Sequence, residues 1–503
     1  MVNEPDVRLL VLTDMHYIPA SDGEVDFSPR CKATLGAELV RRTVAAAARQ
    51  GGFDCVLLLG DLHDCGAGEA AEAAVLELRR QIEQAAPGAP VLAVPGNHDF
   101  DMEIFTKVLG SPPGLHEVRG SGGGACRLVL FADPHGAGNR CTRSEEDREL
   151  LRRASSETGP PIVVAQHTPV NPAIDSYFPP LLTNRAEVMA DYAACGVAIS
   201  LGAHCHAGGP MCEIDGVKYL AVPALCESPF RYVLVSLCGR QVFVETRALA
   251  CCGPPPLADW HAHTEFAYCG RGITARRVIE RARNFGLAGQ CLVEHAGQLY
   301  CRAEDFWQAE HVHRPAAWRE GEHSRMREFR EAMSPLRSGF VRVGLEVELD
   351  ANGDLTVRSE DRAWADVLVG AIHWLPARDF ESLSDAEFAA AFMRANDRML
   401  AAGIDILAHP WRVFRRTGRG VPGELYGPLA EMLAATGTAV ELNFHVNEPD
   451  ERFFAACIER GVKVAPASDA HEPWEAGGLT AHVSFIGRAA VGRDVGELLL
   501  PWR

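Results

Sequence analysis

Short apolar runs that alternate with helical patterns are the feature that most constrains the fold of this chain. In the first half these runs cover residues 7–12, 55–59, 91–94, 128–131, 162–165 and 197–201. Each run is too short for a buried helix and is bounded by Gly, Pro or Asp, as is typical of buried strands. Ala-, Leu- and Glu-rich stretches between the runs favour helices. The alternation therefore predicts an α/β fold in which helices cover the sheets.

A proline-rich segment divides the chain into two parts. Residues 251–256 read Cys-Cys-Gly-Pro-Pro-Pro, which cannot continue a helix or a central strand and is typical of a linker. Four closely spaced β runs between residues 211 and 245 precede it and predict an antiparallel meander that closes the first part. After the linker the strand-then-helix alternation restarts, which favours a barrel-like α/β domain. We therefore expect two domains, residues 1–250 and 256–503.

Composition limits the function classes. The 503 residues carry 49 basic and 67 acidic side chains, a net charge of −18, so binding to a nucleic-acid backbone is disfavoured. No apolar stretch is long enough to span a membrane, and the start of the chain lacks a signal-peptide pattern. The 16 cysteines form no disulfide-like framework, which favours reduced thiols and a cytoplasmic location. Nothing in the sequence indicates an oligomeric state.

Polar residues of the kinds that bind metals follow five of the apolar runs in the first half. They are Asp14 and His16, Asp61, Asn97 and His98, His167, and His204 and His206. In α/β folds such residues meet at the carboxyl ends of the strands. Carboxylate, imidazole and amide ligands suit Mn, Fe or Zn. Because a carboxylate can bridge two cations, and two metals can hold a phosphoryl group and activate water, the pattern indicates phosphate-ester hydrolysis.

The order DxH, GD, GNHD, H, HxH over residues 1–250 resembles the calcineurin-like metallophosphoesterases. The resemblance implies an α/β sandwich with two metals, one held by Asp14, His16, Asp61 and His206, the other by Asp61, Asn97, His167 and His204. Asp61 would bridge the metals, and His98 would protonate the leaving oxygen or bind phosphate. His63 lies where the family more often has an apolar residue, and we expect it to be exposed rather than to contact substrate.

A second set of ligand-type residues follows the linker. It consists of His261 and His263, His295, Glu346, His373, His409, Asp469 and His471, again mostly at the ends of strand-like runs. In an extended strand the two rings of the HxH motif project from one face. The residues therefore gather at one end of a repeating α/β pattern.

The pattern DxHxH, EH, GLEVEL, GAIHW, LAHP, SDAH resembles the PHP (polymerase and histidinol phosphatase) superfamily over about residues 257–475. The resemblance implies a distorted (β/α)7 barrel that holds two or three divalent metals. His261, His263, Glu346 and Asp469 would form one site, Glu346, His373 and His409 a second, and His295 and His471 would help to hold a third. The further His of histidinol phosphatases is absent here; Cys269 or Arg271 could replace it. Glu294 and Asp259 are expected to orient ligand imidazoles.

Cationic residues near the second set are candidates for phosphate binding, since the Arg guanidinium binds phosphate oxygens as a planar fork. Arg412 is the preferred catalytic candidate because it follows the His409 strand end. The other candidates are Arg415, Arg416, His311, His313, Arg314 and Arg325. Residues 169–180 are expected to form a loop over the first site, and residues 301–337 a helical excursion or lid over the second.

Together these patterns predict a bifunctional metal-dependent phosphoesterase that acts on a small phosphorylated substrate. The first domain would hydrolyse a phosphodiester or related ester, and the second a phosphomonoester, with action in sequence on one substrate as a further hypothesis. Two alternatives remain open. One is a nuclease or exonuclease-type enzyme, which the acidic charge disfavours. The other is a regulatory scaffold with one inactive domain, which would lack ligands in one site.

Overall fold

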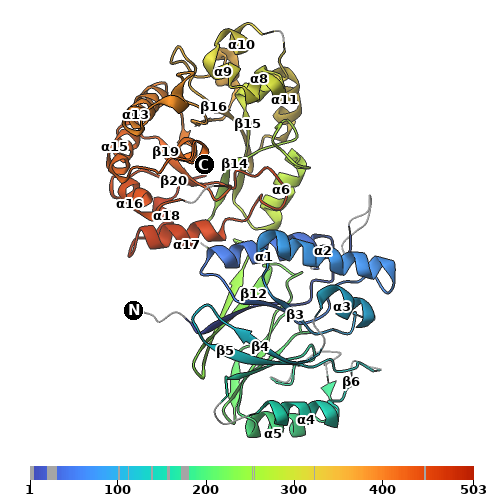
Figure 1. The fold of residues 1–503 in the computed structure, drawn as a ribbon. Coiled ribbons are helices and arrows are strands. Elements are labelled where there is room, and N and C mark those ends of the chain that lie inside the picture. Colours follow the sequence, from blue (N-terminus) through green and yellow to red (C-terminus); the bar gives the residue numbers. More distant parts are fainter. Residues whose placement is uncertain are drawn as a thin grey trace. The chain divides into compact units, whose positions relative to one another are not determined.

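The computed structural model divides the chain into two compact units, Met1–Leu249 and Ala250–Arg503. It describes residues 5–19, 31–99, 102–110, 113–136, 140–155, 159–171, 181–251, 253, 255–321, 323–446 and 449–502. Each unit is an α/β structure with its own sheets (Figure 1). The α/β fold class predicted from the sequence is confirmed.

The first unit is a sandwich of two mixed sheets. One has the order β13 (Gln241–Ala248), β12 (Arg231–Cys238), β1 (Val7–Leu12), β2 (Cys55–Leu58) and β3 (Val91–Ala93). The other has the order β10 (Cys212–Ile214), β11 (Val217–Ala221), β9 (Val197–Gly202), β7 (Ile162–Ala165), β5 (Ala125–Leu130) and β4 (Gly114–Arg119). A short pair, β6 (Arg140–Cys141) and β8 (Leu181–Leu182), lies apart from both sheets in the pairing pattern.

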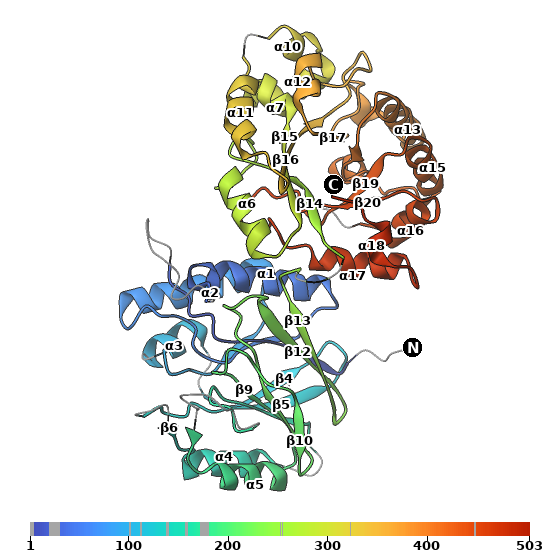
Figure 2. The same cartoon turned by 180° about the vertical axis from the view of Figure 1, so that it is seen from behind.

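Helices cover both outer faces of this sandwich (Figures 1 and 2). One side carries η1 (Ala33–Leu35), α1 (Gly36–Arg49), α2 (Glu69–Ala85) and α3 (Met102–Leu109), and the other carries α4 (Glu145–Ala154) and α5 (Arg185–Ala194). Between the sheets lies an apolar core in which Leu9, Leu57, Leu128, Ile199 and Val235 are fully buried. These residues come from both sheets, so burial of their inner faces joins the two layers.

The predicted closing meander is wrong. The strands form two separate antiparallel hairpins, β10–β11 and β12–β13. β11 pairs in parallel with β9 in one sheet, whereas β12 pairs antiparallel with β1 in the other. Each of the four predicted runs forms a strand, but the spacing of apolar residues does not determine which sheet each hairpin joins.

The second unit contains a seven-stranded parallel sheet in sequence order. Its strands are β14 (Ala258–Ala262), β15 (Gly289–His295), β16 (Val341–Val347), β17 (Val367–Gly370), β18 (Ile406–Leu407), β19 (Ala439–Leu442) and β20 (Val464–Pro466). The first and last edges approach each other, because Asp469 N donates to His261 O at 2.8 Å and His263 N donates to Ala470 O at 3.0 Å. The sheet is therefore a nearly closed barrel, as predicted.

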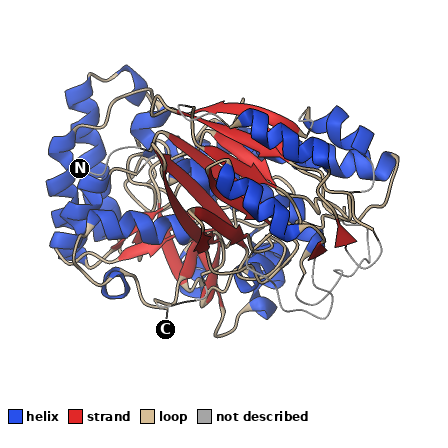
Figure 3. Ribbon diagram, turned by 90° about the horizontal axis from the view of Figure 1, so that it is seen from below, coloured by secondary structure: helices blue, strands red, loops and turns tan. Residues whose placement is uncertain are grey.

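A ring of helices surrounds these strands (Figures 1 and 2), and Figure 3 distinguishes the helices, strands and loops of the chain by colour. They are α6 (Ala275–Asn284), α7 (Ala296–Tyr300), α8 (Ala303–Trp307), α9 (Glu310–His313), α10 (Ala316–Arg319), α11 (Met326–Met333), α12 (Ser359–Trp364), α13 (Asp385–Ala401), α14 (Arg412–Arg416), α15 (Tyr426–Thr436), α16 (Glu451–Glu459), α17 (Thr480–Ala489) and α18 (Val495–Leu498), with short 3-10 turns η3 (Ser334–Leu336), η4 (Phe380–Ser382) and η5 (Gly423–Leu425). The predicted excursion at residues 301–337 thus holds α8 to α11.

Alternation along the strands separates two apolar layers in the barrel. On β17, Leu368 packs in a cluster that includes helix residues such as Phe388 and Phe453. Val367 and Val369, which face the opposite way, pack with residues of other strands such as Val293 and Ile406. The barrel interior is therefore filled mainly by small and branched side chains together with Trp260. The ligand-type residues lie beyond this layer, at the strand ends.

Two further observations concern the whole chain. None of the helices that the structure describes combines the length and apolar character needed to cross a bilayer. The cysteines among the described residues form no disulfide.

Candidate metal centres

Six of the ligand-type residues have a left-handed backbone. The φ angles are 49° at Asp14, 46° at His16, 49° at Asp61, 63° at His204, 26° at His409 and 49° at Asp469. Non-glycine residues rarely adopt this region, which costs about 1–3 kcal/mol at each position. Such strain persists where the surrounding structure demands it and often marks functional sites. Here it occurs where a strand ends, and it redirects the side chain into a shared cluster.

The first cluster contains a group of four side chains around His16. Its Nε2 atom lies 3.1 Å from Nε2 of His206, 3.7 Å from Oδ2 of Asp61 and 3.9 Å from Oδ1 of Asp14. Two imidazole nitrogens bound tetrahedrally to one Zn²⁺ at about 2.0–2.1 Å lie roughly 3.3–3.4 Å apart, close to the His16–His206 separation. The structure thus brings together the four residues predicted for one metal.

A second group shares Asp61 with the first. Nε2 of His167 lies 3.3 Å from Oδ2 of Asp61, 3.1 Å from Oδ1 of Asn97 and 3.2 Å from Nδ1 of His204. His204 Nδ1 lies 2.7 Å from Asn97 Oδ1. These are the four residues predicted for the other metal. Because Asp61 belongs to both groups, its carboxylate is placed to bridge two cations.

Outer partners orient these imidazoles by their second ring nitrogen, as is usual for metal-binding His. His16 Nδ1 lies 3.0 Å from Asp64 Oδ1, His206 Nδ1 lies 2.9 Å from Glu227 Oε1, and His167 Nδ1 lies 2.7 Å from the Leu59 carbonyl. Sequence reasoning missed Asp64 and Glu227. Asp64 lies three residues after Asp61 of the GD motif, and this position was the available signal. Glu227 is distant from every motif.

The buried atoms of this cluster fit divalent cations. Oδ1 of Asp14 is buried and has no hydrogen-bond partner among the described residues. Burial would lower the pKa of His16, but Asp64, Asp61 and Asp14 raise it to about 9. Burial would also lower the pKa of His167, but Asp61 and Asp14 raise it to about 9. Carboxylates therefore concentrate negative charge where the ligand atoms converge, which favours a cation.

His98 lies beside the cluster and remains partly accessible. Its Nδ1 lies 2.7 Å from Asp64 Oδ1, its side chain is 35% exposed, and its backbone N–H donates to Asp61 Oδ1 at 2.9 Å. The hydrogen bond with Asp64 raises the pKa of His98 above its usual 6.5. His98 is therefore available to bind or protonate a group at the metals.

Two other histidines require comment. The expectation that His63 is exposed is wrong, because only 3% of the residue is accessible and its Nδ1 accepts a hydrogen bond from Cys65 N at 3.2 Å. His135 was missed by sequence reasoning, yet its Nε2 lies 2.7 Å from Thr168 Oγ1 and its ring centroid is 5.8 Å from that of His167. No motif of the sequence contains it. Residues 172–180 of the predicted loop lie outside the described residues.

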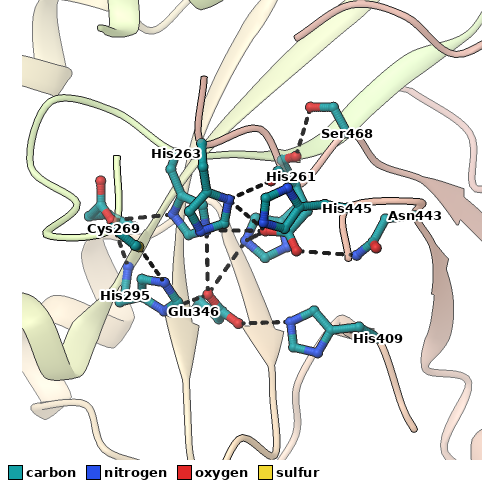
Figure 4. Close-up of polar contacts among 12 residues, drawn as sticks. His261, His263, Cys269, His295, Glu346, His409, Asn443, His445 and Ser468 are labelled. Carbon is teal, nitrogen blue, oxygen red and sulfur yellow. Dashed lines mark hydrogen bonds and ion pairs between the residues drawn. The ribbon is translucent and has the colours of Figure 1, made fainter. Parts of the chain in front are cut away.

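Glu346 is the centre of the second cluster (Figure 4). Five imidazoles face its carboxylate: His295 at 2.7 Å, His409 at 3.2 Å, His261 at 3.5 Å, His373 at 3.6 Å and His263 at 3.8 Å. The ligand sets predicted for two sites therefore meet at Glu346. His295 also reaches this carboxylate, beyond its predicted role in a third site.

Asp469 forms the other acidic point of this cluster. Its Oδ1 lies 3.2 Å from His263 Nε2 and 3.9 Å from His261 Nε2. Arg412 extends its guanidinium to within 3.3 Å of Asp469 Oδ2. The His471 ring lies 4.4 Å from that of His263, centroid to centroid. Arg412 thus lies at the cluster, as predicted for a phosphate-binding residue.

In the second cluster, too, buried carboxylates contact the second ring nitrogen of several histidines. His261 Nδ1 lies 2.8 Å from Glu441, His263 Nδ1 lies 3.3 Å from Glu294, and His373 Nδ1 lies 2.9 Å from Glu348. The structure places Glu294 against an imidazole, as expected. Asp259 instead accepts hydrogen bonds from Ser468 and the backbone of His261, so the expectation that it orients an imidazole is wrong.

Sequence reasoning missed Glu441, Glu348 and His445 around this cluster. Glu441 lies within the predicted strand that became β19, and Glu348 is the fifth residue of the GLEVEL motif, two residues after Glu346, so alternation alone could have marked both as inward-facing. The His445 ring stacks on His471 with centroids 4.2 Å apart. No strand-end pattern had singled it out.

The second cluster also fits divalent cations. His261 Nε2 is buried without a hydrogen-bond partner among the described residues and lies 3.5 Å from Glu346 Oε2. Burial would lower the pKa of His261, but Glu441 and Glu346 raise it well above 6.5. His263, His295 and His471 also place ligand atoms within 4.8 Å of one another.

The remaining phosphate candidates mostly have structural partners. Arg325 donates to the carbonyls of Phe266 and Gln298, and the exposed Arg314 pairs with Glu310. His311 contacts Glu348, and His313 lies 3.3 Å from the Pro376 carbonyl. Arg416 packs over the Trp374 ring. Arg415 is exposed on helix α14.

The comparisons with known proteins bear on the first unit. The family described as calcineurin-like phosphoesterase matches residues 7–208, a stretch that contains both groups that share Asp61. Residues 7–208 form a calcineurin-like phosphoesterase domain. The protein is accordingly a metal-dependent phosphoesterase, a hydrolase. The match does not extend into the second unit, whose resemblance to the PHP superfamily stays a prediction.

The chain was also compared with solved structures and with curated proteins. A dimetal phosphatase from Danio rerio is 18% identical, with 49% of this chain and 97% of that chain covered and a TM-score of 0.37. A second solved structure is 12% identical, with coverage of 48% and 98% and a TM-score of 0.33. The search of curated proteins found no significant match.

Proposed function

We propose that the first unit hydrolyses a phosphodiester or related ester through a dinuclear metal centre. The observation that carries this proposal is the shared position of Asp61, whose Oδ2 faces His16 at 3.7 Å and His167 at 3.3 Å from opposite ligand groups. Two bound metals would supply charge neutralisation for the phosphoryl oxygens and lower the pKa of a water. Mn, Fe and Zn all suit this mixture of carboxylate, imidazole and amide ligands.

The side chains of the chain would divide the remaining tasks. Asp64 holds His98 and His16 through one carboxylate oxygen, so the positions of an acid and a ligand are coupled. His98 would donate its proton to the leaving oxygen or hold the phosphate. The buried outer partners keep each imidazole nitrogen aimed at the cluster, which limits reorganisation during the reaction.

The test is Asp61→Ala in the full chain, compared with Asp191→Ala as a matched control on helix α5. Asp61→Ala should lower the metal content and abolish most turnover of a diester, since both ligand groups lose a member. Asp191 pairs with Arg148 and Arg152, away from both ligand groups, so its loss should leave metal content and rate unchanged. Wild-type turnover in a folded, metal-replete Asp61→Ala protein would disprove the bridging role.

We propose that the second unit is a phosphomonoesterase of the PHP type. The convergence of five imidazoles on Glu346 supports a multinuclear centre, and Arg412 beside Asp469 supports recognition of a terminal phosphate. A guanidinium offers paired donors that match phosphate oxygens. The small phosphorylated substrate would bind at the barrel mouth, with residues of the helical excursion beside it.

The test is the double variant His261→Ala with His263→Ala in the full chain. It should lose release of inorganic phosphate from small monoesters in the presence of Mn, Fe or Zn. Asp61→Ala provides the reciprocal control, because it should leave this monoesterase activity intact. Activity confined to DNA ends, with none on monoesters, would contradict the proposal and favour the nuclease alternative.

We further propose that the two units act in sequence on one small substrate in the cytoplasm. A diesterase product carries a terminal phosphate, which is the substrate of a monoesterase. The acidic net charge of −18 supports a small substrate rather than a nucleic acid. The 16 cysteines, among whose described members no disulfide forms, support a reducing compartment.

A further inference from the structure

We propose that Cys269 binds a third metal of the barrel as a thiolate, together with His295 and His471, and that this position prefers Zn²⁺ to Mn²⁺. The inference rests on the proposed metal centre of the second unit and deepens it. The sequence left Cys269 and Arg271 as alternative replacements for an absent His, and their side chains lie in different surroundings in the structure.

The Cys269 side chain points into the cluster (Figure 4). Its Sγ atom lies 3.6 Å from Nε2 of His295. A sulfur at about 2.3 Å and a nitrogen at about 2.0–2.1 Å from one tetrahedral Zn²⁺ would be roughly 3.5–3.6 Å apart. The observed separation matches the one expected for two ligand atoms on the same ion.

A second donor points at the same sulfur. The side-chain amide of Gln298 donates to Cys269 Sγ at 3.4 Å, and Gln298 is fully buried. An N–H donor aimed at sulfur stabilises the thiolate, which is the form that binds metals. The amide is held in place because its oxygen accepts a hydrogen bond from Tyr268 N. Gln298 would thus act as the outer partner of a thiolate ligand.

Three buried groups complete the environment. His295 places its Nδ1 2.7 Å from the buried Glu346 Oε2, and its Nε2 faces Cys269. His263, His295 and His471 offer ligand atoms within 4.8 Å of one another. Cys269 is a fourth ligand-type group beside that set, because its sulfur contacts His295. A buried carboxylate and three imidazoles around a cysteine are a metal-binding environment rather than an apolar core.

Arg271 does not compete for this position. Its guanidinium is 83% exposed and lies 3.7 Å from Glu472. The backbone of Arg271 instead donates to the His471 carbonyl at 2.8 Å. That bond ties the end of the loop to a predicted ligand and leaves the arginine side chain in solvent. The loop therefore presents the cysteine, not the arginine, to the cluster.

The chemistry of sulfur implies the metal preference. Thiolates select Zn²⁺ over harder ions such as Mn²⁺, whereas carboxylate and imidazole ligands accept either. The two positions around Glu346 hold only nitrogen and oxygen ligands and would stay permissive. The Cys269 position would then be the selective one in this chain.

The experiment uses the full chain, stripped of metal and titrated with Co²⁺ as a spectroscopic probe. The variants are Cys269→Ser, Cys269→His and, as a matched control, Cys301→Ser. Cys301 is a buried cysteine of the same unit whose sulfur faces the Ala317 carbonyl rather than the cluster. Metal content is counted by mass spectrometry on the same samples.

We expect a thiolate-to-cobalt charge-transfer band in the wild type and in Cys301→Ser. The band should vanish in both Cys269 variants, while Cys269→His keeps the ion because imidazole replaces the thiolate. The preference for Zn²⁺ over Mn²⁺ should fall in Cys269→His, because an imidazole accepts either ion. Loaded Zn²⁺ should also protect Cys269 from alkylation.

Other outcomes overturn the inference. No band in the metal-loaded wild type, or a band of unchanged intensity in Cys269→Ser, would show that Cys269 is only a hydrogen-bonded thiol. Failure of the underlying function is a separate result: the His261→Ala/His263→Ala protein would then bind as much metal as the wild type. The two failures therefore produce different measurements.

Discussion

At the scale of single residues, six ligand-type side chains lie at strained backbone positions, and others lie in strands or a few residues beyond a strand end. Asp14, Asp61 and Asp469 all have φ near 49°. This strain redirects short side chains toward shared points, and each point is surrounded by buried carboxylates. The chemistry that follows depends on which imidazoles carry protons and which face metals.

His98→Ala should lower turnover by about 10²–10⁴-fold, the usual contribution of a general acid, while metal content stays at the wild-type level. The His98 ring contacts Asp64, and its backbone N–H donates to the Asp61 carboxylate. Neither predicted ligand group includes the His98 side chain, so its loss leaves both groups complete. Steady-state rates on a diester and metal analysis provide the measurement. His116→Ala, on edge strand β4, is the control; an equal loss of rate in both variants would refute the acid role.

Metal loading should release protons at pH 7. The pKa values of His16 and His167 are raised to about 9 by the nearby carboxylates, so both imidazoles are protonated at pH 7 when no metal is bound. Metal binding needs the neutral imidazole, and affinity should therefore fall as the pH falls below 9. Calorimetry in buffers with different ionisation enthalpies measures the released protons. A binding enthalpy independent of the buffer would contradict this expectation.

At the scale of elements, a buried polar network links the second sheet of the first unit to its metal ligands. The Arg143 guanidinium makes paired hydrogen bonds to Asp133 at 2.6 and 2.7 Å and donates to Tyr192 at 3.0 Å. Tyr192 in turn donates to Gln166, the residue before His167. The network therefore connects helix α5 with the end of strand β7.

Arg143→Leu should lower the free energy of unfolding of the first unit by about 3–5 kcal/mol, because it leaves the buried Asp133 carboxylate without its partner. Urea denaturation monitored separately for the two units provides the measurement. The control is Arg119→Leu, whose ion pair with Glu117 is exposed and should change the stability by less than about 1 kcal/mol. Similar midpoints for wild type and Arg143→Leu would argue against a stabilising network.

At the scale of the whole molecule, two unrelated α/β units with ligand clusters share one chain. The first unit is a sandwich whose ligands follow strands of both sheets, and the second is a parallel barrel whose ligands follow successive strands. Joining two sites raises the local concentration of an intermediate, although only modestly if it diffuses freely. Complementary diesterase and monoesterase activities would then complete one conversion.

The sequential proposal predicts different intermediates in the two knockouts. Asp61→Ala should abolish most turnover of the diester, since the first cleavage depends on this residue. His261→Ala with His263→Ala should let the monoester accumulate without free phosphate. Chromatography of the products and a phosphate assay distinguish these outcomes. Phosphate release at the wild-type rate from the double variant, or no compound that passes through both sites, would exclude the relay.

The sequence alone determined the α/β class, most strands and the sets of residues that meet at each cluster. Strand ends are legible because an apolar run stops abruptly at a polar residue, as at Asp14 and His373. The order of strands in the barrel followed from strand-helix repetition, since parallel neighbours need a crossover. The closing meander was wrong because antiparallel hairpins can join either sheet with the same spacing.

Only the tertiary structure decided which groups stand behind the ligands and which side chain turns inward. Glu227 and Glu441 are far in sequence from the imidazoles they hold, and no local pattern encodes such contacts. Cys269 and Arg271 belong to one short loop, and the hydrogen bond from Arg271 N to His471 orients it so that the thiol enters the cluster. Sequence periodicity predicts which residues share one face of a strand or helix. Long-range packing and backbone strain determine which distant groups the side chains on that face contact.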